Sequence, residues 1–282
     1  MTVYGFIGAG NMVGAIVRGA VAAGLTRGED AATILLTSPH DSAAELAAQL
    51  ADPRVEVLTD VSALVRRSEV LVLGVKPQVV PGVLKQVHQE LGEHTPLLVS
   101  LAAGLALARL ESLTPNGTRM VRVMPNLAAA VGESMTAVTA NLLATQADVD
   151  AVLALMNAVG RTVILEEGHF SAFIGLAGSS PAFVFHFIDD LARAGVMAGI
   201  PKAQAVAIVC QAVLGAARMV QAQAPAQTAA GVGRTPADLL DAVCSPGGTT
   251  VAGILALEQA GFAAAVAQAF QSVVERDRDL GA

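Results

Sequence analysis

The chain has 282 residues, of which 54% are hydrophobic and 15% charged, enough for two domains with a large core. So few charged residues cannot cover the whole surface, and we therefore expect a homo-oligomer whose subunits cover one another. The formal net charge of −7, without a cluster of Lys or Arg, argues against a nucleic-acid partner. Two cysteines and five scattered histidines predict neither a disulfide scaffold nor a metal site.

Strand-like sequence begins at Val3, where a secretory leader would carry a basic and then an apolar segment, so we expect a cytoplasmic protein. One stretch, Gly168 to Ile188, lacks Asp, Glu, Lys and Arg and resembles a membrane span. Its middle contains Ser179 and Pro181, which predict a helix start with serine at the N-cap and proline in the first turn. We therefore expect two helices of a soluble protein and no membrane partner.

Residues 1–165 alternate strand-like and helix-like runs, which predicts a doubly wound parallel sheet with helices on both faces. The predicted strands are Val3–Ile7, Thr33–Leu36, Val70–Gly74, Leu97–Leu101 and Met120–Met124, extended at the edge by Met135–Thr139 and Thr162–Leu165. The predicted helices are Asn11–Ala23, Ser42–Leu50, Pro81–Leu91, Ala106–Leu110 and residues 146–159. This segment is expected to form an α/β domain.

Residues 166–282 lose the strand signal and are rich in alanine, which predicts an all-helical second domain. The expected helices are Pro181–Ala198, Lys202–Ala222, Pro236–Ala242, Thr250–Ala260 and Phe262–Arg278. Between Ala203 and Ala217 every face of the helix is apolar or carries an amide, so we expect a partner subunit to surround it. Residues 221–235 are the expected loose segment.

A glycine turn follows the first strand and precedes an apolar helix, the arrangement that holds the pyrophosphate of a dinucleotide. The residues expected to hold it are Gly8, Ala9, Gly10, Asn11 and Met12. The second strand ends at Thr37 and Ser38 without the Asp or Glu that would bind a ribose 2′-hydroxyl, which favours NADPH over NADH. The two hydroxyls would donate to the 2′-phosphate; a capped turn is the alternative.

Three later strand ends face the same crevice of such a sheet. They carry Val75, Lys76 and Pro77, then Ala102, Ala103 and Gly104, and then Asn126. The small residues 102–104 would let a nicotinamide ring lie close to the backbone, and Asn126 would bind its amide or order the loop. An ordinary turn between strand and helix is the alternative for each.

A second candidate site lies at residues 245–250, which read Ser-Pro-Gly-Gly-Thr-Thr and lead into an apolar helix. The two glycines free the backbone, so that several N–H groups can converge on one anion at the helix start. The segment therefore predicts a binding site for a small carboxylic acid.

Together these segments resemble pyrroline-5-carboxylate reductase over nearly the whole chain. The matching segments are Gly5–Met12, Val75–Pro77, Ala102–Gly104, Arg122–Asn126, Gly178–Phe183 and Ser245–Thr250, of which the last is the most specific. The resemblance implies an N-terminal Rossmann domain, here 1–165, and a C-terminal helical dimerisation domain, here 166–282. It also implies a homo-oligomer, either a dimer or a decamer built from dimers.

The resemblance further implies hydride transfer from NADPH or NADH to the C=N bond of L-Δ1-pyrroline-5-carboxylate, which gives L-proline. By this resemblance Thr250 is the catalytic residue and hydrogen-bonds the ring nitrogen. Ser245 and the backbone N–H groups of Gly248, Thr249 and Thr250 hold the carboxylate, and Glu167 lies at the pocket edge. The chain departs from the family pattern at Val61, where relatives have an asparagine, and at Gly233, where many have a glutamate.

Two other functions stay open. A hydroxyacid or other imine reductase would share the two-domain plan, but the hydroxyacid enzymes place a lysine on the first helices of the second domain. Between Glu167 and Pro201 this chain has no lysine. A non-catalytic dimer that senses NADPH would have no use for the segment at 245–250, and a turnover assay separates it from an enzyme.

Overall fold

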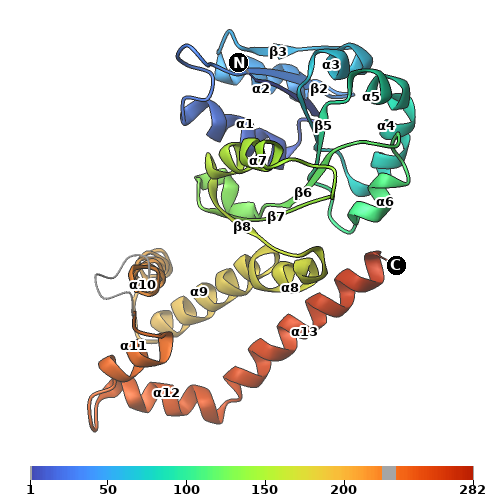
Figure 1. Cartoon of the computed structure of the whole chain (residues 1–282). Coiled ribbons are helices and arrows are strands. Elements are labelled where there is room, and N and C mark those ends of the chain that lie inside the picture. Colours follow the sequence, from blue (N-terminus) through green and yellow to red (C-terminus); the bar gives the residue numbers. More distant parts are fainter. Residues whose placement is uncertain (1, 224–232, 282) are drawn as a thin grey trace. The chain divides into compact units, whose positions relative to one another are not determined.

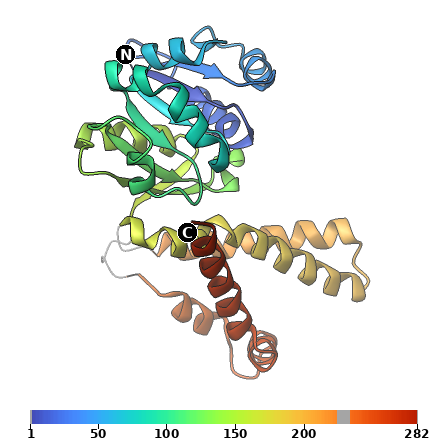
Figure 2. The ribbon, with the colours of Figure 1, turned by 90° about the vertical axis from the view of Figure 1, so that its right-hand side faces the viewer.

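The computed structural model describes residues 2–223 and 233–281, and its contacts group into two compact units. The first unit comprises Met1–Ser179 together with Val273–Ala282, and the second comprises Ser180–Ser272. The first is a sheet with helices on both faces, and the second consists of helices (Figures 1 and 2). The first unit thus includes residues on both sides of the expected boundary at 165/166, which stays a prediction.

Within the described residues, eight strands form one sheet in the order β3-β2-β1-β4-β5-β6-β7-β8. The strands are β1 Val3–Ile7, β2 Thr33–Thr37, β3 Val55–Val57, β4 Val70–Leu73, β5 Leu97–Ser100, β6 Met120–Met124, β7 Ser134–Ala140 and β8 Gly160–Ile164. The chain leaves β1 for β2 on one side and later adds β4 on the other, so the strand order reverses beside β1. A crevice for ligands forms at the carboxyl end of strands at such a point.

Two strands, β7 and β8, run opposite to the other six. The sheet is parallel from β3 to β6, but β7 pairs with β6 antiparallel, with Arg122 opposite Thr139. A parallel crossover needs about a dozen residues or more, and the connection between β6 and β7 spans only 125–133. The expected parallel sheet is thus confirmed from β3 to β6, and the two edge strands, whose direction the sequence analysis did not give, are antiparallel to it. The sequence analysis also missed β3 and α3, which are too short to show a clear period.

The helices of the first unit cover both faces of the sheet. They are α1 Asn11–Ala22, α2 Ser42–Leu50, α3 Val61–Arg67, η1 Pro77–Val79, α4 Val80–Gln86, α5 His88–His94, α6 Leu107–Glu111, η2 Leu127–Val131, α7 Gln146–Asn157, η3 Glu167–His169, α8 Phe170–Phe173 and the π-helix η4 Ile174–Gly178. One core packs α1 and α7 on the sheet, with Ile16 and Leu155 fully buried. The other lies under α3 to α6, with Leu64 and Leu84 fully buried. The helix expected at 81–91 is two helices, because Val87 leaves helical dihedral angles.

The second unit contains α9 Ser180–Met197, α10 Lys202–Ala222, α11 Pro236–Val243 and α12 Thr249–Gln259. Helix α13, Phe262–Gly281, begins in the second unit and ends in the first. The expected loose segment at 221–235 lies mostly outside the described residues. Most of α9 and α10 remains exposed, and by length and apolar composition the helical stretches 167–197 and 202–222 would also suit a membrane. The bent pair formed by α12 and 262–279 would suit a further span.

The helix break expected at Ser179 does not occur, because this residue keeps helical dihedral angles of −97° and −26°. Its N–H donates to the carbonyl of Ile174 at 2.8 Å, the bond of a π turn, and the chain continues into α9. Pro181 has no N–H to give to the carbonyl of Ala177, four residues earlier. That carbonyl accepts a hydrogen bond of 2.8 Å from Asn126 Nδ2 instead. A side chain from the loop after β6 thus compensates for the proline.

Candidate dinucleotide and substrate sites

The glycine turn after β1 fits a pyrophosphate. Gly8 has φ of +100°, and a Cβ added there would lie 2.8 Å from the carbonyl oxygen of Gly74. Helix α1 then begins at Asn11 with Gly10 as its N-cap, without a side-chain cap and without an acidic residue in the first turn. A Cβ added at Gly10 would meet no atom within 4 Å, so the approach to these N–H groups is open. Such a helix start attracts an anion.

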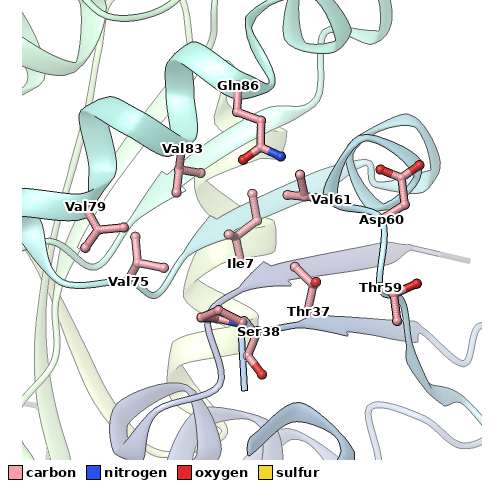
Figure 3. Close-up of a pocket in the computed structure, with 12 residues that line it drawn as sticks. Ile7, Thr37, Ser38, Thr59, Asp60, Val61, Val75, Val79, Val83 and Gln86 are labelled. Carbon is pink, nitrogen blue, oxygen red and sulfur yellow. The ribbon is translucent and has the colours of Figure 1, made fainter. Parts of the chain in front are cut away.

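A cavity of about 350 Å³ adjoins this turn, lined by the ends of β1 and β2 and by α4. Figure 3 shows the apolar side chains of Val75, Val79 and Val83 along one side of it, with Thr59 and Asp60 toward the other. Thr37, Ser38 and Gln86 also line the cavity. Apolar walls with a few polar groups suit an adenosine moiety.

Ser38 is engaged within its own turn. Its hydroxyl donates to the carbonyl of His40 at 2.5 Å and accepts from the N–H of Ala43 at 3.1 Å. This is the capped turn that the sequence left open as the alternative. Contact of Thr37 and Ser38 with a 2′-phosphate stays a prediction, which their position in the cavity supports.

Asp60 is a cavity residue that the sequence analysis missed. It follows β3, which pairs in parallel with β2, so the ends of both strands meet at the same edge. Asp60 Oδ1 accepts from the N–H of Ser62 at 2.9 Å and so caps α3, while Oδ2 lies 3.4 Å from Arg66 Nη2. An aspartate before an apolar helical run is an N-cap signal that could have found it. The cavity thus contains an acid at the start of α3, although the tip of β2 has none.

The other expected cofactor residues lie at the same edge of the sheet. Ile7 pairs with Leu73, and Leu73 pairs with Ser100, so the turns after β1, β4 and β5 are neighbours. The turn after β4 holds Val75 to Pro77, with Lys76 exposed, and the turn after β5 holds Ala102 to Gly104. Gly104 has φ of +73°, a conformation that favours glycine.

Asn126 orders the loop after β6. Its Oδ1 accepts from the N–H of Ala128 at 3.1 Å and its Nδ2 donates to Ala177, while its own N–H donates to Ser134 Oγ at 3.1 Å. The side chain is buried. The loop-ordering role, one of the two that the sequence left open, is therefore visible, and a direct contact with nicotinamide stays a prediction.

Glu167 lies at the centre of a network that joins three segments. Its Oε1 accepts from the N–H of Leu107 at 2.7 Å and from Arg122 Nη1 at 2.8 Å. The Arg122 guanidinium lies 4.6 Å from the centre of the Phe170 ring, and its side chain is only 7% exposed. A cavity of about 440 Å³ beside this network also includes Gly104. A charged residue inside the apolar strand β6 was the signal that could have indicated Arg122.

The segment at 245–250 repeats the design of the first glycine turn within the second unit. Gly247 has φ of +68°, and Gly248 is the N-cap of α12, again without a side-chain cap or an acidic residue in the first turn. The N–H of Gly248 donates to the Ser245 carbonyl at 3.0 Å, which closes the turn. A Cβ at Gly248 would lie 2.4 Å from Ser245 Oγ and 3.0 Å from the Ser245 carbonyl oxygen, so a larger residue would crowd this turn. The first N–H groups of α12 are therefore presented to an anion.

Gly233, where many relatives have a glutamate, lies next to the end of α10. A Cβ added there would lie 1.5 Å from the carbonyl oxygen of Gln223. A glutamate would therefore require this backbone to move. Glycine at 233 and the close approach of Gln223 are consistent with each other.

A sheet whose strand order reverses beside a glycine turn and an uncapped helix start defines a dinucleotide-dependent oxidoreductase. Residues 3–104 match the family model described as NADP oxidoreductase, coenzyme F420-dependent. Residues 167–280 match the model described as pyrroline-5-carboxylate reductase dimerisation. The two models thus cover most of the sheet-forming and the helical part of the chain separately.

Full-length relatives give the particular family. A pyrroline-5-carboxylate reductase of Methanosarcina acetivorans is 38% identical over 277 residues, covering 98% of this chain and 97% of the relative. The structure of the enzyme from Coxiella burnetii is 29% identical, with a TM-score of 0.88, covering 100% of this chain and 99% of the other. The Plasmodium falciparum pyrroline carboxylate reductase with NADP bound is 25% identical, with a TM-score of 0.83 and coverage of 100% and 98%. The chain belongs to the pyrroline-5-carboxylate reductase family, as the sequence resemblance indicated.

Proposed function

We propose that the chain reduces L-Δ1-pyrroline-5-carboxylate to L-proline with NADPH, and that the two glycine-capped helix starts hold the two reactants. The observation that carries the activity is the full-length match to relatives of that name. The chemistry of the donor groups supports it, because each helix start offers N–H groups to an anion: a pyrophosphate at α1 and a carboxylate at α12.

In this proposal the first unit binds and orients the cofactor. The turn at Gly8 to Met12 holds the pyrophosphate. Thr37 and Ser38 donate to the 2′-phosphate, for which the Ser38 hydroxyl turns away from the carbonyl of His40. The nicotinamide end lies against Val75 to Pro77, Ala102 to Gly104 and the loop that Asn126 orders. NADPH, when bound, supplies the hydride.

The second unit binds the substrate. The N–H groups of Gly248, Thr249 and Thr250, together with Ser245, hold the carboxylate. The Thr250 hydroxyl hydrogen-bonds the ring nitrogen. A cyclic imine accepts hydride best at carbon when its nitrogen is already protonated, so no side chain has to deliver a proton in the same step. The residues need to align the two reactants, exclude water and hold the charge.

A second copy of the chain is the proposed partner of the helical unit. The dimerisation model covers residues 167–280, and large apolar side chains such as Phe185 and Ile208 are more than half exposed. Association would remove this surface from water, which favours a dimer. We propose this dimer as the smallest active form and the cytoplasm as its location. A decamer would be built from such dimers. The division into a cofactor domain, 1–165, and a substrate and dimerisation domain, 166–282, belongs to the same proposal.

The experiment that tests the activity follows NADPH absorbance with pyrroline-5-carboxylate as substrate. We expect oxidation by the wild type and a loss of about ten- to a hundredfold in kcat/KM for Thr250→Ala, because a hydrogen bond to the reacting ring is removed. Thr250→Ser keeps the hydroxyl and is expected to recover most of the rate. NADPH binding, measured by its fluorescence, serves as the control and is expected to be the same in all three proteins.

The outcomes separate the two parts of the proposal. A wild type that leaves NADPH unoxidised contradicts the activity itself. A Thr250→Ala enzyme with the full rate contradicts only the assignment of Thr250.

A further inference from the structure

The residues after β5 that are proposed to contact nicotinamide form a loop that is fixed at both ends. At the start, the N–H of Leu101 donates to the carbonyl of Leu73 at 3.1 Å, and the N–H of Ala102 donates to Ser100 Oγ at 3.2 Å. At the far end the loop enters α6, whose N-cap Ala106 offers no side-chain acceptor. The acceptor comes instead from Glu167, sixty positions away, which receives the N–H of Leu107 at 2.7 Å.

The same carboxylate oxygen is held by a buried arginine. Arg122 lies on β6 with its guanidinium over the ring of Phe170, and 7% of its side chain is exposed. A guanidinium with so little contact with water needs a counter-charge. Glu167 supplies it at 2.8 Å. The position of the carboxylate is therefore set by β6 and Phe170, and the position of Leu107 follows from the carboxylate.

We infer that the Arg122–Glu167 ion pair is a positioning device that sets where the loop from Ala102 to Ala106 lies against the nicotinamide. The inference rests on the proposed cofactor site, and it gives Glu167 a role other than direct contact with the substrate. Both residues act through the loop and are positioning residues. The ion pair and the loop line the same cavity, since Gly104, Arg122 and Glu167 are all among its lining residues.

The chain contains a matched control. Asp148 also accepts hydrogen bonds at a helix start and from an arginine beside β6, because it closes the capping box of α7 with Thr145 and pairs with Arg119. None of the proposed cofactor loops contacts Asp148 through a hydrogen bond among the described residues. Loss of Asp148 thus removes a comparable acid–arginine cap without touching the nicotinamide loop.

The test compares Glu167→Ala, Glu167→Gln and Asp148→Ala in the full chain. In Glu167→Ala we expect kcat/KM for NADPH to fall between about tenfold and a hundredfold, because small misplacement at a reacting centre has effects of that size. Glu167→Gln retains an oxygen that can accept from Leu107 and is expected to lose less. Asp148→Ala is expected to melt at a lower temperature but to keep kcat and KM within about twofold of the wild type.

A second readout does not depend on turnover. In the protein without ligand, hydrogen exchange of the Leu107 amide is expected to be faster in Glu167→Ala than in the wild type. In Glu167→Gln it is expected to be slower than in Glu167→Ala, and in Asp148→Ala it is expected to equal the wild-type rate. The dissociation constant for NADPH, from fluorescence, is expected to rise only in the Glu167 variants. If Glu167→Ala does not fold, Glu167→Gln and Arg122→Lys provide the same comparison.

Two results overturn the inference. The first is faster exchange at Leu107 with unchanged NADPH affinity and kinetics, since the loop position would then not matter. The second is an equal kinetic loss in Asp148→Ala, since the effect would then be one of general stability. A wild type without turnover contradicts the proposed function alone, because exchange and NADPH affinity still decide the role of the pair.

Discussion

The two units of the chain differ in how far their apolar side chains are buried. In the first unit, side chains such as Leu36, Val72 and Leu84 are fully buried between the sheet and its helices. In the second unit, the buried apolar cluster of the described residues consists of Ala192, Ala205 and Val209. Each exposed square ångström of apolar surface costs about 25 cal/mol relative to burial. The first unit therefore has its own core. The exposed apolar side chains of the second unit are explained if another copy of the chain covers them.

Helix starts show a second contrast. The helices α7 and α11 begin with complete capping boxes, Thr145 with Asp148 and Thr235 with Asp238. Helices α1 and α12 begin with Gly10 and Gly248 and have neither a side-chain cap nor an early acid. A capped helix start is already satisfied, and an uncapped one is available to a ligand. Helices α4, α6 and α10 also lack a side-chain cap and an early acid, so α1 and α12 differ from them by the glycine at the N-cap. These two glycine-led starts are the ones that the sequence assigned to anions.

A charge on the exposed face of the second unit should have the largest effect. Phe185 on α9 is 56% exposed, and Phe185→Asp would place a carboxylate in the proposed subunit interface. We expect loss of the dimer at micromolar concentration and loss of activity, measured by analytical ultracentrifugation and NADPH oxidation. Leu142→Asp, at a fully exposed leucine of the first unit, is the control and should change neither. An unchanged sedimentation coefficient for Phe185→Asp would contradict the proposed interface.

The glycine turn gives the next largest effect. In Gly8→Ala the new Cβ would lie 2.8 Å from the Gly74 carbonyl oxygen at a φ of +100°. We expect the free energy of unfolding to fall by about 1–3 kcal/mol. The dissociation constant for NADPH should rise by about tenfold or more. Gly10→Ala is the matched variant, because its φ of −74° and open surroundings tolerate a methyl group. It should fold normally and weaken NADPH binding alone; equal melting temperatures for the two variants would refute this distinction.

The two capping boxes should contribute differently to the stability of the protein at low pH. Burial alone would raise the pKa of Asp148, but hydrogen bonds from Thr145 and the charge of Arg119 hold it below its usual value. A carboxyl with a lowered folded-state pKa stabilises the protein above its unfolded pKa of about 4, and this contribution is lost as the pH falls through the folded-state value. Asp148→Asn should therefore cost about 1–3 kcal/mol at pH 7 and flatten the loss of stability below about pH 4.

Denaturant unfolding at several pH values measures this effect. Asp238 also has a pKa lowered by its hydrogen bond from Thr235, but it is exposed, so Asp238→Asn should have the smaller effect. Equal losses in the two variants would show that burial of the capping box does not matter.

The smallest expected effect concerns cofactor choice. Asp60 lines the adenosine cavity and is 60% exposed, so its repulsion of a 2′-phosphate is weakened by solvent and by Arg66. Asp60→Asn keeps the N-cap of α3, since asparagine caps as well as aspartate. We expect the ratio of kcat/KM for NADPH to that for NADH to rise by about two- to fivefold. Glu56→Gln, which removes an acid paired with Arg67 outside the cavity, is the control and should leave the ratio unchanged.

The sequence was informative where the evidence is local. Short apolar runs located β1, β2, β4, β5 and β6, and the glycines at 8 and 247 stand where a positive φ favours glycine. The direction of β7 depended on the length of a connection rather than on its own residues, and the sequence analysis did not predict it. The family resemblance added the catalytic assignment of Thr250, which the pattern of residues alone does not contain.

Contacts between distant positions were beyond a single sequence. Nothing near Glu167 indicates that it caps α6, because its partner Leu107 lies in another segment. The pairing of Asn126 with Ala177 depends in the same way on how a loop and a helix meet. The acid that lines the adenosine cavity, Asp60, lies between β3 and α3, two elements that the sequence analysis missed because they are short. Each omission concerns a side chain whose role arises from tertiary packing.

Helix α13 leads the chain from the second unit back into the first. Its residues from Val273 onward group with the first unit, where Asp277 Oδ2 accepts from Ser171 Oγ at 2.8 Å. The helical unit is therefore an insertion within the α/β unit, and the polypeptide crosses between them twice, at 179–180 and at 272–273. A cut at 272–273 would leave the two units covalently joined at 179–180. After a cut at 179–180 they would be held together only by the non-covalent packing of residues 273–282 within the first unit.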